Sequence, residues 1–369
     1  MQLRIRLARR CSFFLFSMSL LATMAGADEG PVQFQLLPDF GGLNSAAPDA
    51  NLRITARVRM AANSRVGMLE VTATMNESWH VYSITQPPGG PMKTTIKLAP
   101  SEDYRLLGSF APDHAAHVHF IDVFDMDVEE HPGQVTWSVP FELSAAGTSS
   151  ALVIKGHVEG QVCSDRGGCI PFGQKENSFS AKLSGTLSPS ASSTLAGIRL
   201  PNTHGSIRGW LSTTKASPGD TVQLYVSIDP DKDWHVYAYA KIPPSLFQKP
   251  TLLETRIPPG WTTGPVATSA PVISTPSPLP NDPPTRYYAG PVTWSLPLHI
   301  PVSAQPGTYP LEGHVAFQTC AATCDAPTAT AWQSKLQVVS AGTADTSGLL
   351  AAVGFSAQPS PYDSVVDRL

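Results

Sequence analysis

Three short segments of this sequence occur twice, in the same order and at nearly constant spacing. The repeated segments are Trp-His-Val-Tyr (79–82 and 234–237), Val-Thr-Trp-Ser (135–138 and 292–295) and Gly-His-Val followed by a cysteine (156–163 and 313–320). The three offsets are 155, 157 and 157 residues. Chance does not preserve order and spacing over three separate segments, so we interpret the chain as a tandem duplication of one module. Each copy ends its best-matched segment in a close pair of cysteines, which makes these pairs the first candidates for chemistry.

The N-terminal segment has the three parts of a secretory signal peptide. Four arginines between positions 4 and 10 give a positive region, residues 13–24 are apolar, and Ala25-Gly26-Ala27 fits the small-residue cleavage rule. The sequence therefore predicts a cleaved signal peptide over 1–27 and a periplasmic mature protein, with an uncleaved anchor as the alternative. Cys11 is expected to leave with the peptide, and the four remaining cysteines lie where disulfides can form.

The composition favours a turn-rich, all-β protein. The 369 residues include 35 prolines and 28 glycines, and 42% of them are hydrophobic, which is enough for a sizeable core. The formal net charge is -4, only 15% of the residues are charged, and no basic stripe occurs, so nucleic acid is not an expected partner. Neither a phosphate-binding loop nor a nucleophile-elbow motif occurs, and no cofactor is expected.

Hydrophobic and polar residues alternate at matching places in the two modules. The alternation covers 69–75 and 135–141 in the first module, and 222–228 and 292–298 in the second. Short alternating strands separated by turn-forming residues predict two tandem immunoglobulin-like β-sandwich domains, with a closed barrel as the alternative architecture. Core positions are expected for the four repeated tryptophans, Trp79, Trp137, Trp234 and Trp294.

Changes in composition along the chain predict its domain organisation. The expected segments are the signal peptide (1–27), a Pro/Gly-rich leader (28–51), the first sandwich (52–183), a Ser/Thr/Pro-rich linker (184–205), a second and divergent sandwich (206–340) and a flexible tail (341–369). The apolar run in the tail, 348–355, is far shorter than the ~20 residues that a membrane span needs.

The two cysteine pairs differ in the length of the loop between them. In the first module five residues separate Cys163 from Cys169, and their Asp-Arg-Gly-Gly centre is typical of a turn. A hairpin there would place both cysteines on neighbouring strands, within reach of a disulfide. In the second module three residues separate Cys320 from Cys324, a shorter loop that can still close.

Two structural roles compete with a redox role for these pairs. A disulfide that closes a ring this small stabilises the fold by only about 2 kcal/mol in the chain-entropy model, and a module of this size hardly needs it. Zinc is disfavoured because the paired Cys-x2-Cys ligand spacing is absent. For the first pair the residues alone leave the structural and redox roles open, since Asp165 opposes thiolate formation and Arg166 favours it.

The first module resembles the N-terminal periplasmic domain of the thiol:disulfide interchange protein DsbD family. The resemblance covers about 130 residues and rests on Cys163 and Cys169 followed by Ile170-Pro171, on the aromatic strand 79–82 and on the run 156–161. It implies an immunoglobulin-like sandwich in which Cys163 and Cys169 are the redox-active pair and exchange with partner thiols through a mixed disulfide. It also implies partners: a membrane electron transporter as the source of electrons, and oxidised periplasmic thiol proteins as their destination.

The resemblance extends to residues near the pair. His80 and Tyr82 fall where the family places polar aromatic side chains beside the cysteines, and alternation turns both to the face opposite to their neighbours. A solvated strand face is the alternative. The segment 120–127 matches the family's cap loop, whose aromatic residue shields the sulfurs. Phe124 is the candidate shield and Asp122 a candidate acid or base, with ordinary loop packing as the alternative for both.

The second module departs from the family pattern. Its cysteines, Cys320 and Cys324, lie closer together, no proline follows them directly, and the region matching the cap (265–285) contains no phenylalanine. A structural disulfide is therefore expected here, with a second redox centre as the alternative. The chain also lacks the family's membrane and thioredoxin-like domains, so the electron transporter is expected to be another polypeptide.

Three functions are compatible with these residues. The first is thiol:disulfide interchange of the protein-disulfide reductase type through Cys163 and Cys169. The second is a non-catalytic exported binding protein with structural disulfides. The third is copper handling by His114, His117, His119 and Met126, near Asp122. These residues show no fixed ligand spacing, so a solvated loop is the favoured alternative and no metal site is assigned.

Overall fold

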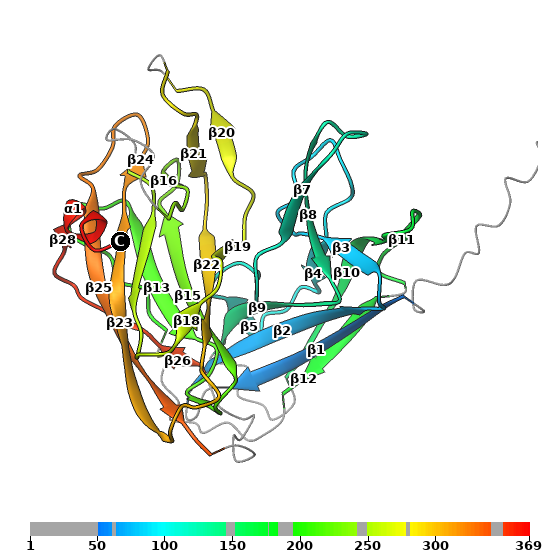
Figure 1. Ribbon diagram of the computed structural model, residues 1–369, viewed down its shortest axis with the longest axis horizontal. Coiled ribbons are helices and arrows are strands. Elements are labelled where there is room, and N and C mark those ends of the chain that lie inside the picture. The colour runs from blue at the N-terminus through cyan, green and yellow to red at the C-terminus, as the bar shows by residue number, and fades with distance from the viewer. Residues whose placement is uncertain are drawn as a thin grey trace, which may run out of the picture. The chain divides into compact units, whose positions relative to one another are not determined.

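The computed structural model describes eight stretches of the chain, which are residues 51–60, 64–144, 152–175, 177–183, 195–241, 249–277, 281–340 and 350–369. Almost all of their regular structure is β-strand (Figure 1). The one helix among these residues is the single turn α1 (Asp363–Val366), and no described helix has the length and hydropathy to cross a bilayer. The predicted signal peptide and nearly all of the predicted leader lie outside the described residues.

The first module is a sandwich of two antiparallel sheets. One sheet has the order β1–β2–β9–β5, with β6 also on β9, and the other has the order β11–β10–β3–β8–β7, with β4 and β12 also on β10. The strands of the first sheet are β1 (Leu52–Met60), β2 (Val66–Met75), β5 (Tyr104–Leu106), β6 (Ala111–Pro112) and β9 (Gln134–Leu143). Those of the second are β3 (Trp79–Tyr82), β4 (Thr95–Leu98), β7 (His117–Ile121), β8 (Met126–Pro132), β10 (Val153–Ser164), β11 (Cys169–Phe172) and β12 (Ser178–Lys182).

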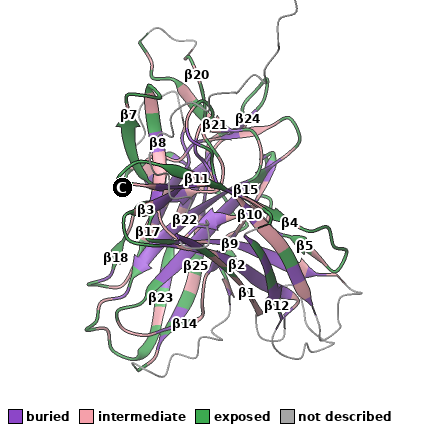
Figure 2. Ribbon diagram, turned by 90° about the vertical axis from the view of Figure 1, so that its right-hand side faces the viewer, coloured by how far each residue is buried: buried purple, intermediate pink, exposed green. Residues whose placement is uncertain are grey.

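Alternating side chains from both sheets form the core of the first module. Val71 of β2 and Trp137 of β9 meet Val81 of β3 and Val162 of β10, and all four are fully buried. Figure 2 colours the buried stretches of the strands purple. Trp79 is half-buried and packs against this cluster. The alternation arises because successive strand residues point to opposite faces of a sheet. The all-β, immunoglobulin-like prediction is confirmed.

The second module repeats the strand arrangement of the first. Its sheets have the orders β18–β22–β15–β13–β26, β14–β25–β23–β17 and β20–β21–β16–β24, with β19 also on β22, and β27 and β28 also on β25. The strands are β13 (Gly205–Leu211), β14 (Lys215–Ala216), β15 (Thr221–Pro230), β16 (His235–Tyr237), β17 (Leu252–Arg256), β18 (Thr262–Thr263), β19 (Ala267–Thr268), β20 (Ile273–Thr275), β21 (Thr285–Tyr288), β22 (Val292–His299), β23 (Gly307–Phe317), β24 (Thr319–Cys320), β25 (Thr328–Val338), β26 (Ala351–Ala352), β27 (Gly354–Phe355) and β28 (Ser360–Pro361). The central pair β15–β22 thus corresponds to β2–β9 of the first module.

The tryptophans of the second module have two different environments. Trp294 is fully buried in the core, as the sequence predicts. Trp234 is not a core residue, because it lies in the turn before β16 and stacks on His204 with ring centroids 3.7 Å apart. Asp233, the residue before Trp234, has a positive φ of 67°, as Ser78 before Trp79 does, so the stacking on His204 rather than the turn distinguishes Trp234.

Two segments that the sequence predicts to be irregular are packed in part. Leu195 and Leu200, in the C-terminal half of the predicted linker, are buried. The expectation of a flexible tail over 341–369 does not hold for residues 350–369. There β26 pairs with β13, and Tyr362 and Val365 are buried against β17. The anchoring apolar residues are widely spaced among Gly, Ser and Pro, so composition alone conceals them.

The repeated glycines of the Gly-His-Val segments are explained by close strand packing. A Cβ atom on Gly156 would lie 2.5 Å from the backbone of β4 and 2.6 Å from the Phe179 ring. One on Gly313 would lie 2.0 Å from the backbone of β17 and 2.7 Å from the Trp332 ring. In both modules, therefore, an aromatic side chain from the neighbouring strand occupies the space above the glycine.

We predict that Gly156→Ala and Gly313→Ala each lower the free energy of unfolding by about 1–3 kcal/mol, because a methyl group overpacks the strand contact. Urea denaturation measures the change. Gly290→Ala is the matched control, since a Cβ there meets no atom within 4 Å, and it should change stability by less than about 0.5 kcal/mol. Equal effects at all three positions would contradict this explanation.

A buried histidine gives the first module a specific sensitivity to acid. His131 of β8 is fully buried, its Nδ1 lies 3.2 Å from Nε2 of His114, and Nδ1 of His114 lies 2.7 Å from Oδ1 of Asp113. The pKa of His131 is lowered to about 3, chiefly by burial and also by the charges of His114 and His117, while the charge of Asp113 opposes the decrease. His131 is therefore neutral at physiological pH.

We predict that His131→Leu reduces the loss of stability on acidification. The pKa of His131 is lower in the folded chain than the ~6.5 of the unfolded chain, so its contribution is present above pH 6.5 and is lost as pH falls toward 3. Between pH 7 and pH 4 that loss is on the order of 3 kcal/mol. Urea denaturation at both pH values measures it. His299→Leu, at an exposed position, is the control, and its free energy of unfolding should fall between pH 7 and pH 4 as much as that of the unaltered protein. The same decrease in His131→Leu would contradict the assignment.

Candidate functional site

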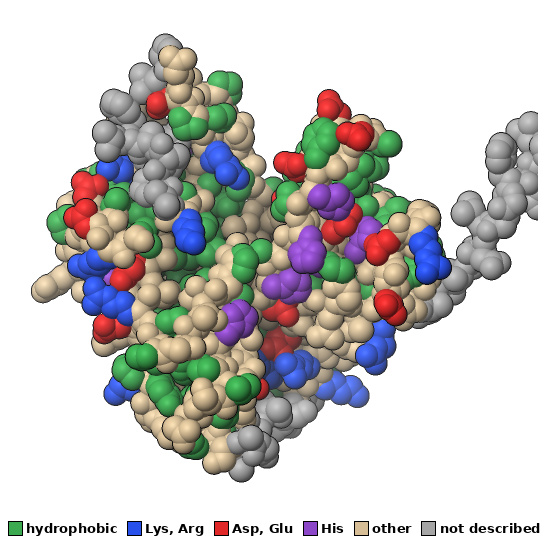
Figure 3. Space-filling view, viewed as in Figure 1, with side chains coloured by type: hydrophobic (Ala, Val, Ile, Leu, Met, Phe, Trp, Pro, Cys, Tyr) green, Lys and Arg blue, Asp and Glu red, His purple; other side chains and the backbone are tan. Residues whose placement is uncertain are grey.

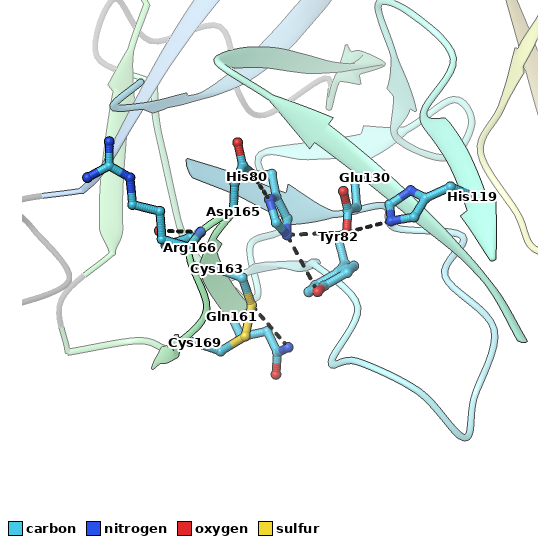
Figure 4. The surroundings of a disulfide bond; sticks show 10 residues. His80, Tyr82, His119, Glu130, Gln161, Cys163, Asp165, Arg166 and Cys169 are labelled. Atoms are coloured by element: carbon cyan, nitrogen blue, oxygen red, sulfur yellow. Dashed lines mark hydrogen bonds and ion pairs between the residues drawn. A yellow bond between two sulfur atoms is a disulfide. The ribbon is translucent and has the colours of Figure 1, made fainter. Parts of the chain in front are cut away.

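The disulfide Cys163–Cys169 closes the hairpin between β10 and β11 (Figure 4). The two cysteines are direct register partners, as the predicted hairpin requires. Gly167 and Gly168 supply the turn with φ of 92° and 97°, a conformation that glycine adopts without strain. The two sulfurs have different surroundings, because Cys163 is only 2% exposed whereas Cys169 is exposed.

Strand β3 places His80 and Tyr82 on the same sheet face as Cys163. His80 is the register partner of Cys163, and Tyr82, Val128 and Cys163 form a small buried group that we call the Cys163 cluster. The intervening residue of β3, Val81, points to the sandwich core instead. Both His80 and Tyr82 are buried, so this is not a solvated strand face. The alternation predicted for this strand is confirmed.

The His80 ring lies between two carboxylates. Its Nδ1 is 3.1 Å from Oδ1 of Asp165, and its Nε2 is 3.3 Å from Oε1 of Glu130 (Figure 4). Nε2 also lies 3.5 Å from the Tyr82 hydroxyl, and Nε2 of His119 lies 3.7 Å from the same oxygen of Glu130. The two carboxylates thus fix the orientation of the imidazole ring on the strand next to the disulfide.

Tyr82 and Gln161 complete the polar surroundings of the buried sulfur. The pKa of Tyr82 is raised to about 12, chiefly by burial and also by the charge of Glu130, while a hydrogen bond with Gln161 opposes the increase. The Tyr82 hydroxyl is therefore protonated at neutral pH. Nε2 of Gln161 donates a hydrogen bond to Sγ of Cys163 at 3.4 Å.

The predicted cap segment is a hairpin of β7 and β8 rather than an irregular loop. Ile121 and Met126, at the ends of its turn, pack against the Cys163 cluster. Phe124 lies within the turn and is 41% exposed, and Asp122 is exposed there and accepts a backbone hydrogen bond through its carbonyl. The roles of Phe124 as shield and of Asp122 as acid or base stay predictions. Ile121 and Met126 were not predicted as residues of the site, because the sequence does not show at which residues the strands end and the turn of the hairpin begins.

Three further residues of the site were missed by sequence reasoning. Glu130 lies directly opposite Tyr82 in the β3–β8 pair, and Gln161 precedes Cys163 by two residues on β10. The signal that identifies both is the two-residue period of a strand, but it becomes usable only once the register is known. His119 joins the site through the β7–β8 pairing.

The histidines near the cap are divided between two places. His114 contacts His131, whereas His119 contacts Glu130, and Figure 3 shows histidine and acidic side chains together on the visible face near β7 and β8. Over the described part of the chain, no three His, Cys, Asp or Glu side chains are grouped so that they could hold a metal ion.

The second cysteine pair is also a disulfide. Cys320 of β24 is bonded to Cys324 and forms an isolated β-bridge with it. His235 of β16 is the register partner of Cys320. In both modules, therefore, a histidine lies opposite the first cysteine of the pair on the neighbouring strand.

Comparisons with known proteins bear on the first module. Residues 52–181 match the sequence model of the family described as thiol:disulfide interchange protein DsbD, N-terminal. A comparison with curated protein sequences gives no match. Among solved structures, the N-terminal periplasmic domain of ScsB from Proteus mirabilis is 11% identical, with 79% of this chain and 95% of that chain covered and a TM-score of 0.24. A putative membrane anchored protein from Corynebacterium diphtheriae is 14% identical, with 78% and 56% covered and a TM-score of 0.21.

We predict that Tyr82 ionises near pH 12 in the folded chain and near pH 10 in the unfolded chain. Because its folded pKa is the higher one, the stability that Tyr82 contributes is complete below pH 10 and is lost as pH rises toward 12. The difference in tyrosinate absorbance between the wild-type protein and Tyr82→Phe measures the midpoint, with circular dichroism recorded to show that the chain is folded. The same absorbance difference, measured in urea where the chain is unfolded, is the control. A midpoint near pH 10 in the folded chain would contradict the assignment.

Proposed function

We propose that this chain, whose residues 52–181 belong to the DsbD N-terminal family, is a periplasmic thiol:disulfide interchange protein with Cys163 and Cys169 as its working pair. It relays electrons from a membrane electron transporter to oxidised periplasmic thiol proteins. The observation that carries the proposal is the asymmetry of the bond: an exposed sulfur, Cys169, is joined to a buried one, Cys163.

This asymmetry supports different roles for the two sulfurs in exchange. A partner thiolate attacks the accessible Sγ of Cys169, the S–S bond breaks, and its electron pair passes to Sγ of Cys163, which takes up a proton. The second thiol of the partner then attacks the partner's own sulfur in the mixed disulfide, and Cys169 leaves and is protonated. The partner ends as a disulfide, and its two electrons and two protons now reside on Cys163 and Cys169. The reverse sequence passes them to an oxidised protein.

The polar groups around Cys163 suit its role as the leaving sulfur. A thiolate forming at a buried site loses hydration, so nearby donors lower the cost of its formation. Gln161 donates a hydrogen bond to that sulfur, and the His80 ring, positioned by Asp165 and Glu130, lies on the adjacent strand. The neutral Tyr82 hydroxyl supplies a further donor within the same buried group.

Trapping experiments test the roles of the two sulfurs. In a Cys320→Ser/Cys324→Ser background, Cys163→Ser leaves the exposed Cys169, and we predict mixed disulfides with periplasmic thiol proteins. Cys169→Ser leaves the buried Cys163 and should give at least about tenfold fewer mixed disulfides, because exchange requires the remaining sulfur and a sulfur of the partner to come into contact. Non-reducing electrophoresis with mass spectrometry measures both.

The reduction potential of the first pair separates exchange from a merely structural bond. In the same background, redox equilibration with glutathione should give a potential in the range of exchange proteins. A potential below about -300 mV would place the pair among inert structural disulfides. That value, or equal trapping by both single variants, would favour a non-catalytic binding protein.

A further inference from the structure

We propose that the Cys320–Cys324 disulfide of the second module is a second thiol–disulfide exchange centre, built on the same frame as the first. The sequence favours a structural disulfide here, because the loop is shorter and no proline follows. The arrangement of strands and side chains around the pair carries the opposite conclusion. The inference extends the proposed function to a site that the match to the DsbD N-terminal family does not cover.

The strands around the two pairs have the same order. The strand order β10–β3–β8–β7 in a sheet of the first module is matched by the order β24–β16–β21–β20 in the second. His235 is the register partner of Cys320, as His80 is of Cys163. Each histidine also contacts the tyrosine two residues later with nearly perpendicular rings: the centroids are 5.3 Å apart at 85° in the first module and 5.8 Å apart at 82° in the second. The frame of the site is thus retained although the loop is not.

The sulfurs of the second pair have the same asymmetry as those of the first. Cys320 is 1% exposed, and Cys324 is exposed. Exchange needs an accessible sulfur bonded to one that can leave into the protein, and this pair offers both. A structural explanation is weak, because a disulfide that closes so small a ring removes little entropy from the unfolded chain, and the second module has its own large core.

The charges around the second pair differ from those around the first. Tyr287 lies opposite Tyr237, where the first module has Glu130 opposite Tyr82, and its ring centroid is 4.6 Å from that of His235. Ala322 stands two residues after the first cysteine of its pair, the position that Asp165 holds. Asp325 follows Cys324 directly, and its carboxylate accepts hydrogen bonds from His204 and Thr319. The second centre therefore keeps the sulfur geometry and surrounds its histidine with aromatic rings.

The exchange step follows from this geometry. A thiolate attacks Sγ of Cys324, the S–S bond breaks, and the electron pair passes to Cys320, which is protonated. With glutathione as the reductant, a second glutathione thiolate resolves the adduct. Two glutathione thiols then become one glutathione disulfide, and Cys320 and Cys324 become thiols.

The test uses the mature chain with Cys163→Ser/Cys169→Ser, so that only the second pair reports. Under native conditions with an excess of reduced glutathione, followed by alkylation and mass spectrometry, we expect two free thiols. With the first pair also removed and oxidised glutathione supplied instead, each single thiol displaces one glutathione from that disulfide, and Cys320→Ser should form at least about tenfold more glutathione adduct, at Cys324, than Cys324→Ser forms at Cys320. Thiols that appear only after denaturant unfolds the chain, or equal adducts in both single variants, would overturn the proposal.

Two controls keep this result separate from the function of the first pair. Cys320→Ser/Cys324→Ser reports the first pair under identical conditions, so either centre can fail while the other reacts. The unaltered mature protein should yield four thiols in its folded state, which does not depend on any variant folding. Two thiols, mapped by mass spectrometry to Cys163 and Cys169, would leave the second pair as a structural bond and overturn the proposal.

Discussion

The antiparallel pairing of β3 with the end of β10 is the constraint on which the site depends. It places His80 opposite Cys163 and, one residue along, Val81 opposite Val162. The valines fill the sandwich core, and the histidine and cysteine therefore share the outer face. A slip of one residue would move every one of these side chains to the wrong face, so burial of the core fixes the geometry around the Cys163–Cys169 pair.

The parts of the structure that could be predicted from the sequence are those set by local periodicity. Alternation was enough to place Trp137 and Trp294 in the cores and to turn His80 and Tyr82 away from them. The Asp-Arg-Gly-Gly centre was enough to predict the hairpin that joins Cys163 to Cys169, because its glycines adopt positive φ.

The parts that could not be predicted depend on contacts between distant segments. Glu130 lies beside His80 only because β8 pairs with β3, a register that no local pattern specifies. The packing of Tyr362 at the end of the chain and the stacking of Trp234 on His204 are likewise decided by tertiary structure. The repeated glycines were visible in the sequence, but their reason, an aromatic ring from the adjacent strand, was not.

The unequal exposure of the two sulfurs also bears on how a reduced pair meets oxidants. The outward Cys169 encounters a peroxide first, and oxidation of its thiolate gives a sulfenic acid. Cys163 stands within bonding reach and can condense with that acid, releasing water and restoring the disulfide. An accidental oxidation at the surface thus ends in the Cys163–Cys169 disulfide, before the irreversible oxidation of sulfur accumulates.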